Sequence, residues 1–157
     1  MISQIALIVT ALGVLGVIYS LRQNHRERLR QFEAMYVQRY WSIIDRLSLE
    51  VLTGQDNYTL TDDDEKAIRA YFFLCEDELE LRAEKCIADH TYRIWADGIC
   101  SQLLQSAFSR VWDRVRKEKA FPYRYMNLLF ENGSDYDPCK MWLPIRWLRG
   151  IAGPGGV

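Results

Sequence analysis

The first twenty-one residues constrain this chain most, because no charged side chain occurs between Ile2 and Leu21. A helix rises about 1.5 Å per residue, so twenty residues cover roughly 30 Å, the thickness of a bilayer's hydrocarbon core. Tyr19 lies near one end of the run, where an amphipathic ring prefers the headgroup level of the membrane. The run therefore predicts a single transmembrane helix over residues 2–21.

Two alternatives to a membrane anchor remain open. A cleaved signal peptide has a basic start, a shorter apolar core and a small-residue cleavage site, whereas large basic residues follow this run. A buried helix of a soluble domain usually carries a polar stripe. Here the only interruptions are Ser3, Gln4, Thr10 and Ser20, so the anchor is favoured.

The residues beside the run predict its orientation. Four arginines follow it and are expected at the membrane surface: Arg22, Arg26, Arg28 and Arg30. An excess of Lys and Arg marks the cytoplasmic side, and each such residue gains about 1 kcal/mol near an anionic leaflet. We expect a single-pass protein of the cell inner membrane, with the N-terminus outside and residues 22–157 in the cytoplasm.

Composition indicates that the part after the anchor is folded. Aromatic residues make up 13% of the chain and the formal net charge is −1, which argues against disorder and against nucleic-acid binding through bulk charge. Four cysteines lack a paired spacing and are expected to be reduced in the cytoplasm: Cys75, Cys86, Cys100 and Cys139.

Apolar residues recur at spacings of three and four after the anchor, which predicts an all-α fold. We expect the transmembrane helix to continue into a cytoplasmic antiparallel bundle of three long helices and one short helix. The long helices are predicted over residues 22–53, 61–86 and 89–119, and the short one over 123–131. The bundle would occupy residues 22–149, and the glycine-rich residues 150–157 would form a flexible tail.

Several boundaries follow from single residues. No proline or glycine lies between Gly16 and Gly54, so one helix is expected through at least Leu47, with Gly54 just after its end. Two apolar stripes on this helix, one of which contains Val37 and Trp41, predict that it buries two sides. Thr61 is expected as an N-cap, and a kink is expected at Gly98.

No motif for a phosphate loop, a nucleophile elbow or a zinc protease is present, so we predict a non-enzymatic protein without a cofactor. Cys86 and His90 lie four residues apart, a spacing that suits two ligands of one zinc ion on a helix. A helix boundary at Asp89 would spoil that geometry. A buried thiol beside a surface histidine is the alternative.

Two further groups of residues are candidates for contact with partners. The acidic residues Glu76, Asp77, Glu78, Glu80 and Glu84 are expected to point mostly away from the apolar face, and Glu76, Asp77 and Glu80 to face a partner. Trp142 and Trp147, which are surrounded by basic residues, are expected to pack on the bundle or on a neighbouring subunit. Contact with the membrane is the alternative for these tryptophans.

Small residues recur along the anchor, which lets helix backbones approach closely in lipid. They are Ala6, Thr10, Gly13, Gly16 and Ser20. Because glycine and alanine are common in any membrane helix, the pattern also fits an anchor that does not associate.

Residues 68–82, together with residues 92–98, resemble small bacterial proteins known only as domains of unknown function. That family has one N-terminal span, a basic juxtamembrane helix and a cytoplasmic helical region. The resemblance implies a similar layout and brings no activity or site residue with it.

These observations predict a non-enzymatic, membrane-tethered helical module that forms a homo-oligomer or docks a cytoplasmic protein partner, with the lipid bilayer as its other contact. One alternative is a pore-forming effector of a defence or toxin system. The other is a metal-binding protein that uses Cys86 and His90.

Overall fold

The computed structural model describes residues 2–55, 58–118 and 123–140, with the side chains of residues 2–12 left out. Within these ranges the chain is helical and contains no strand, which confirms the predicted all-α fold. The elements are α1 (Ile2–Ile44), α2 (Leu49–Leu52), α3 (Asp62–Ala83), α4 (Asp89–Leu103), α5 (Ser106–Glu118), α6 (Arg124–Asn132) and the 3₁₀ helix η1 (Pro138–Lys140).

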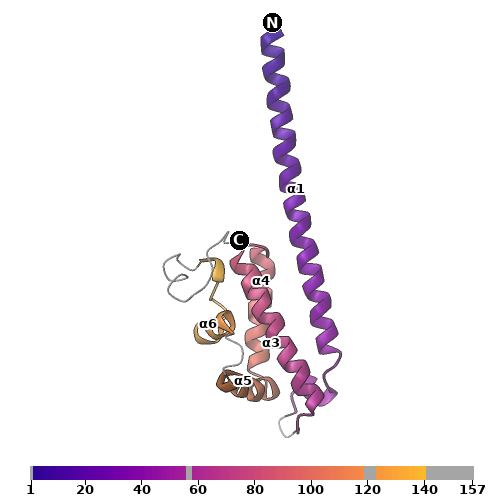
Figure 1. The fold of residues 1–157 in the computed structure, drawn as a ribbon, viewed down its shortest axis with the longest axis vertical. Helices are drawn as coiled ribbons and strands as arrows, with labels where there is room; N and C mark the ends of the chain where they lie inside the picture. The colour runs from indigo at the N-terminus through magenta and orange to yellow at the C-terminus, as the bar shows by residue number, and fades with distance from the viewer. Residues whose placement is uncertain (1, 56–57, 119–122, 141–157) are drawn as a thin grey trace.

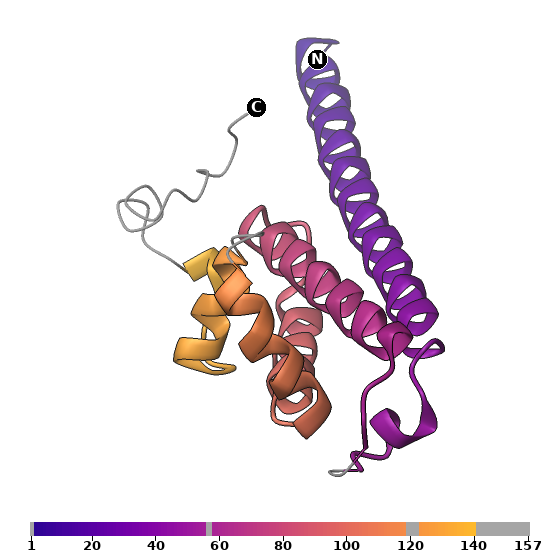
Figure 2. The same ribbon diagram turned by 60° about the horizontal axis from the view of Figure 1, so that its bottom comes forward.

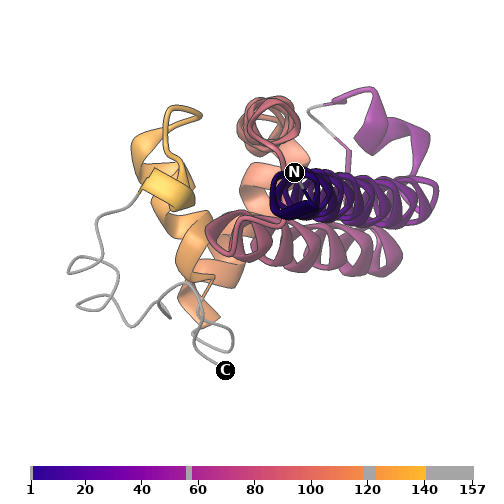
Figure 3. The same ribbon diagram turned by 90° about the horizontal axis from the view of Figure 1, so that it is seen from above.

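The N-terminal half of α1 extends well beyond the other helices, and its C-terminal half joins them (Figures 1 and 2). Helix α3 is the centre of the helical bundle, since it contacts α1, α5, α6 and η1. Viewed along the long axis, α3 and α4 lie on either side of α1 (Figure 3). The C-terminal half of α1 packs against α3, and its Tyr36 ring lies 6.3 Å from the Trp95 ring of α4.

The core is built on both sides of α3, where Ile68, Phe72 and Cys75 are fully buried. The ring of Phe72 meets the ring of Trp112 edge to face, with centroids 5.2 Å apart. Edge-to-face contacts of this kind add to the stabilisation from burial. Helix α5 is thereby fixed against α3.

The prediction that the first long helix buries two sides is wrong over most of its length. In the first stripe Tyr36 and Ile43 are buried, whereas in the second stripe Val37 and Trp41 remain exposed and Ile44 is buried at the end of α1. The two-sided burial belongs to α3 instead, because α3 lies between α1 and the α5–α6 layer.

The predicted helix through Leu47 is also wrong, because α1 ends at Ile44. The backbone N–H of Ser48 donates to the Asp64 carboxylate at 2.9 Å, and Ser48 is extended. A contact from a residue far along the chain therefore ends the helix. Gly54 follows the short α2 at the predicted position after a helix end, with a φ of +69°.

The third predicted helix is two helices. It continues through Gly98 without a break and ends at Leu103, and α5 begins at Ser106. The turn between them brings Phe108 and Trp112 into the core, while Leu104 stays 85% exposed. Packing, rather than a helix-breaking residue, separates α4 from α5.

Among the described residues, no helix is both long enough and apolar enough to cross a membrane. The predicted span begins in residues 2–12, whose side chains lie outside the described part. Trp142, Trp147 and the predicted tail 150–157 also lie outside the described residues.

Candidate functional site

A pocket of about 320 Å³ opens between α1, α3 and α4. A volume near this value is at the lower end of the range for small-molecule sites. Its walls are mostly aromatic and aliphatic, and they are formed by Val37, Tyr40, Trp41, Tyr71, Glu78, Ile94, Trp95, Gly98, Ile99 and Gln102.

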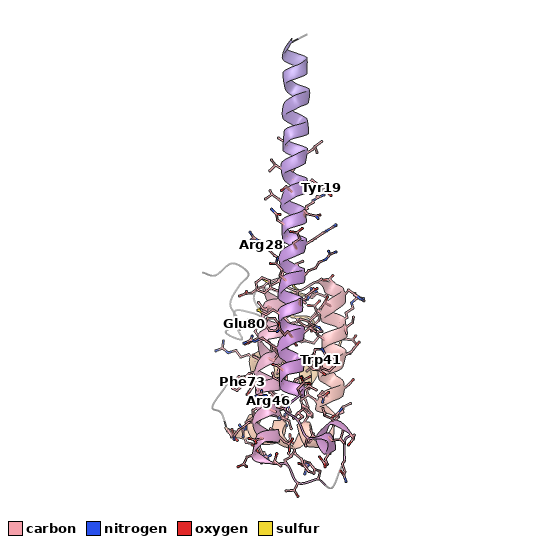
Figure 4. All side chains as sticks on the ribbon, turned by 90° about the vertical axis from the view of Figure 1, so that its right-hand side faces the viewer. Tyr19, Arg28, Trp41, Arg46, Phe73 and Glu80 are labelled. Atoms are coloured by element: carbon pink, nitrogen blue, oxygen red, sulfur yellow. The ribbon has the colours of Figure 1, made fainter. Side chains whose placement is uncertain are left out.

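Helix geometry explains how three helices form this pocket. Val37 and Trp41 lie one turn apart on α1, and Tyr71 and Glu78 lie two turns apart on α3. Figure 4 shows Trp41 on the side of α1 that faces α4. On α4, a Cβ added at Gly98 would meet nothing within 4 Å, so the absence of a side chain there leaves space in the pocket.

The tyrosine rings form a connected part of the wall. The Tyr40 ring lies 5.3 Å from the Trp41 ring and 6.2 Å from the Tyr71 ring, both edge to face. Burial raises the pKa of Tyr40 and, more strongly, that of Tyr71, so both phenols are neutral at physiological pH.

Glu78 is the exception in this apolar lining. The residue is 8% exposed, and its carboxyl group has neither a hydrogen bond nor an ion pair with any described residue, although its oxygens are not fully shielded from solvent. Burial, followed by the nearby charge of Asp77, raises the pKa of Glu78 to about 8. A carboxylic acid in this setting is largely neutral at pH 7 and ionises readily if a cation enters.

The other acids of the predicted cluster are separated by their places on α3. Glu76 is buried rather than facing a partner, and its two carboxylate oxygens accept from the N–H groups of Tyr125 and Met126 at 3.0 and 2.9 Å. Asp77 is half-exposed and lies 3.9 Å from Arg39, whereas Glu80 is exposed.

The prediction that these acids point mostly outward is therefore wrong for Glu76 and Glu78. The physical reason is that α3 is covered on opposite sides, by α1 and by α6. Positions that would be solvated on a surface helix become interior positions on a central one.

Cys86 lies in the turn between α3 and α4, outside any helix, and His90 is exposed on the first turn of α4. The helical spacing that motivated a zinc site therefore does not apply to this pair. Among the described residues no three His, Cys, Asp or Glu side chains are grouped as metal ligands.

The remaining predicted contact residues lie on α1. Gly13, Gly16 and Ser20 are exposed, and a Cβ at either glycine would meet nothing within 4 Å. Ala6 and Thr10 have side chains outside the described part. Four arginines of the predicted membrane surface are exposed: Arg22, Arg26, Arg28 and Arg30.

Sequence reasoning missed the pocket, although two signals pointed to it. One was the second apolar stripe on α1, with Val37 and Trp41. No other described helix covers these two side chains, which remain exposed and line the pocket. The other was Gly98, which lies inside a helix about one turn after Trp95, where a side chain would otherwise be expected. Comparison of the chain with protein-family models, with curated proteins and with solved structures finds no match.

Proposed function

We propose that the protein is a membrane-tethered helical module, held in the inner membrane by residues 2–21 and facing the cytoplasm with its bundle. The observation that carries this proposal is the exposed aliphatic surface of α1 beyond the bundle. Its side chains are 42–63% exposed, at Val14, Leu15, Val17, Ile18 and Leu21. Such a surface is unfavourable in water and favourable in a lipid bilayer.

The tether is tested by placing a charge in this surface. Leu15→Arg should release the protein from membranes in alkaline carbonate, because an arginine stays charged at that pH and is strongly disfavoured inside the hydrocarbon core. Asn24→Arg is the matched control, since it adds the same charge beyond the apolar run and should leave the protein in the membrane fraction. Equal extraction of both variants would rule out the tether.

The orientation needs a separate test. The arginines from Arg22 to Arg30 support a cytoplasmic bundle through the positive-inside rule. Alkaline phosphatase fused after Val157 should therefore be inactive, because this enzyme requires an oxidising compartment outside the cytoplasm. An active fusion would reverse the orientation.

We also propose that the module self-associates through the small residues of its tether. At about 100° per residue, Gly16 and Ser20 lie roughly 160° around the α1 axis from Tyr36, which faces the bundle. A second copy could therefore pack against these residues without meeting either bundle. Small residues let two helices approach closely in lipid, which supports this contact.

Self-association is tested by Gly13→Leu combined with Gly16→Leu. The double variant should be monomeric in mild detergent when the wild-type chain is a cross-linkable oligomer, since larger side chains separate the helix backbones. Leu15→Ile serves as the control that leaves the small residues in place. An oligomer that survives the double change would contradict this contact and leave the tether itself unaffected.

A further inference from the structure

We propose that the pocket between α1, α3 and α4 binds a small organic monocation, an alkylammonium or arylalkylammonium ion, with Glu78 as its counter-ion. Nothing in this inference depends on the tether or on self-association. It rests on the lining of the pocket and on one largely buried carboxyl group in that lining, which has no hydrogen bond or ion pair with a described residue.

The carboxyl group is the first argument. Native proteins rarely bury an acidic side chain that lacks both a hydrogen bond and a counter-charge, because desolvation disfavours the charged form strongly. Glu76, on the same helix, shows the usual solution, with two backbone N–H donors on its carboxylate. Glu78 has no such donor, and it borders a space large enough for a ligand.

The aromatic lining is the second argument. The rings of Tyr40, Trp41, Tyr71 and Trp95 border the pocket. The face of an aromatic ring attracts a cation, most strongly for tryptophan, and cages of such rings recognise quaternary ammonium groups. An apolar ligand would use the same walls, but it would leave the carboxyl group unpaired.

None of the described charged and titratable groups around Glu78 supplies a positive charge that pairs with its carboxylate. Helix α1 contributes Tyr36, Arg39 and Tyr40. Arg39 forms an ion pair with Asp77 at 3.9 Å and lies over the Tyr36 ring. Helix α3 contributes Tyr71, Cys75 and Asp77. The residues that α4 contributes to the pocket are all uncharged: Ile94, Trp95, Gly98, Ile99 and Gln102.

Binding should depend on pH in a defined direction. Because the carboxyl group is protonated over much of the neutral range, a cation must displace its proton, and affinity should rise up to about tenfold per pH unit until Glu78 is ionised near pH 8. Benzyltrimethylammonium is the suitable probe for this profile, since its charge does not depend on pH.

The main experiment is isothermal titration of the full chain, in dodecyl maltoside, at pH 8. The probes are 2-phenylethylamine and its neutral counterpart of nearly equal shape, 2-phenylethanol. We expect the amine to bind at least tenfold more tightly than the alcohol, and we expect this preference to disappear in Glu78→Gln. Glu80→Gln removes an exposed acid two residues away and should bind both probes as the wild type does.

A second variant tests the cavity itself. Gly98→Leu places a side chain in the open space on α4 and should abolish binding of both probes. Equal affinity of amine and alcohol, an unchanged preference in Glu78→Gln, or no binding by a wild-type chain with an intact melting transition would each overturn the proposal. Binding that survives in Gly98→Leu would place the probe elsewhere and overturn it as well.

Discussion

Glu78 and Glu76 lie two residues apart on α3, yet only the carboxylate of Glu76 accepts hydrogen bonds from described residues. Burial raises the pKa of both, but the backbone N–H groups of Tyr125, Met126 and Arg124 oppose that effect at Glu76, and none does so at Glu78. Both residues read as surface acids in the sequence. Only the positions of α1 and α6 decide which acid is satisfied and which is left facing a pocket.

Glu78→Gln should make the protein more stable at pH 8 and leave its stability unchanged near pH 4. The pKa of Glu78 is raised by folding, so its contribution is fully present below about pH 4.5 and is lost as the pH rises towards 8. The difference at pH 8 has an upper limit of about 5 kcal/mol.

Urea unfolding at several pH values measures this effect, and the comparison with wild type cancels the parallel contribution of Glu76. Glu80→Gln is the control and should show no pH-dependent difference. The raised pKa would be contradicted if the difference in free energy of unfolding between wild type and Glu78→Gln were the same at pH 4 and at pH 8.

Gly98→Ala should stabilise the protein by about 0.5–1 kcal/mol, because alanine loses less backbone freedom than glycine in a helix. Gly98 lies inside α4, and a Cβ there meets no atom within 4 Å. Thermal unfolding measures the change. Gly54→Ala is the contrasting variant and should destabilise the protein, since Gly54 has a φ of +69°.

At the scale of elements, local signals predicted the start of α3, but not the turn between α4 and α5. Thr61 forms the expected N-cap, and Asp64 completes a capping box with it. Where distant residues hold a boundary, the outcome was mixed, because the start of α6 lies within one residue of the predicted start and the end of α1 was wrong. The end of α1 depends on Asp64, and the start of α6 depends on Glu76, each far away along the chain.

Glu76→Ala should destabilise the protein by about 2 kcal/mol, because it leaves two buried N–H groups of α6 without acceptors. Tyr123, the residue before α6, provides no side-chain cap of its own. Amide hydrogen exchange should accelerate at Tyr125 and Met126. Asp77→Ala, at a half-exposed position, should leave exchange in α6 unchanged.

At the scale of the whole molecule, the sequence predicted helices but expected two-sided burial of the first long helix, whereas α3 is the helix covered on two sides. Hydrophobic periodicity shows how many sides of a helix are apolar, and both α1 and α3 have more than one. It does not show which of them is covered by other helices and which is left open. The candidate site depends on this distinction, since the open apolar stripe of α1 forms one wall of the pocket.

Ile43→Asp should destabilise the bundle by about 3 kcal/mol or more, because it places an unpaired charge in the contact between α1 and α3. Ser42→Asp is the matched control on the exposed side of the same turn and should change stability by less than about 0.5 kcal/mol. Chemical unfolding of the full chain measures both. Similar losses in the two variants would show that α1 is not docked through Ile43.

Because α1 is one continuous helix from Ile2 to Ile44, it sets the distance between the proposed membrane span and the pocket as well as connecting them. If the proposed tether places residues 2–21 in the bilayer, the twenty residues from Leu21 to Trp41 put Trp41 about 30 Å above the edge of the hydrocarbon core, at about 1.5 Å per residue. The headgroup layer takes up about 5–7 Å of that height, so the pocket lies roughly 20 Å or more above the headgroups. The diffuse ion layer over an anionic leaflet decays within about 8 Å at physiological salt. The pocket would therefore sample cations at their bulk concentration and not at the enriched concentration beside the lipid.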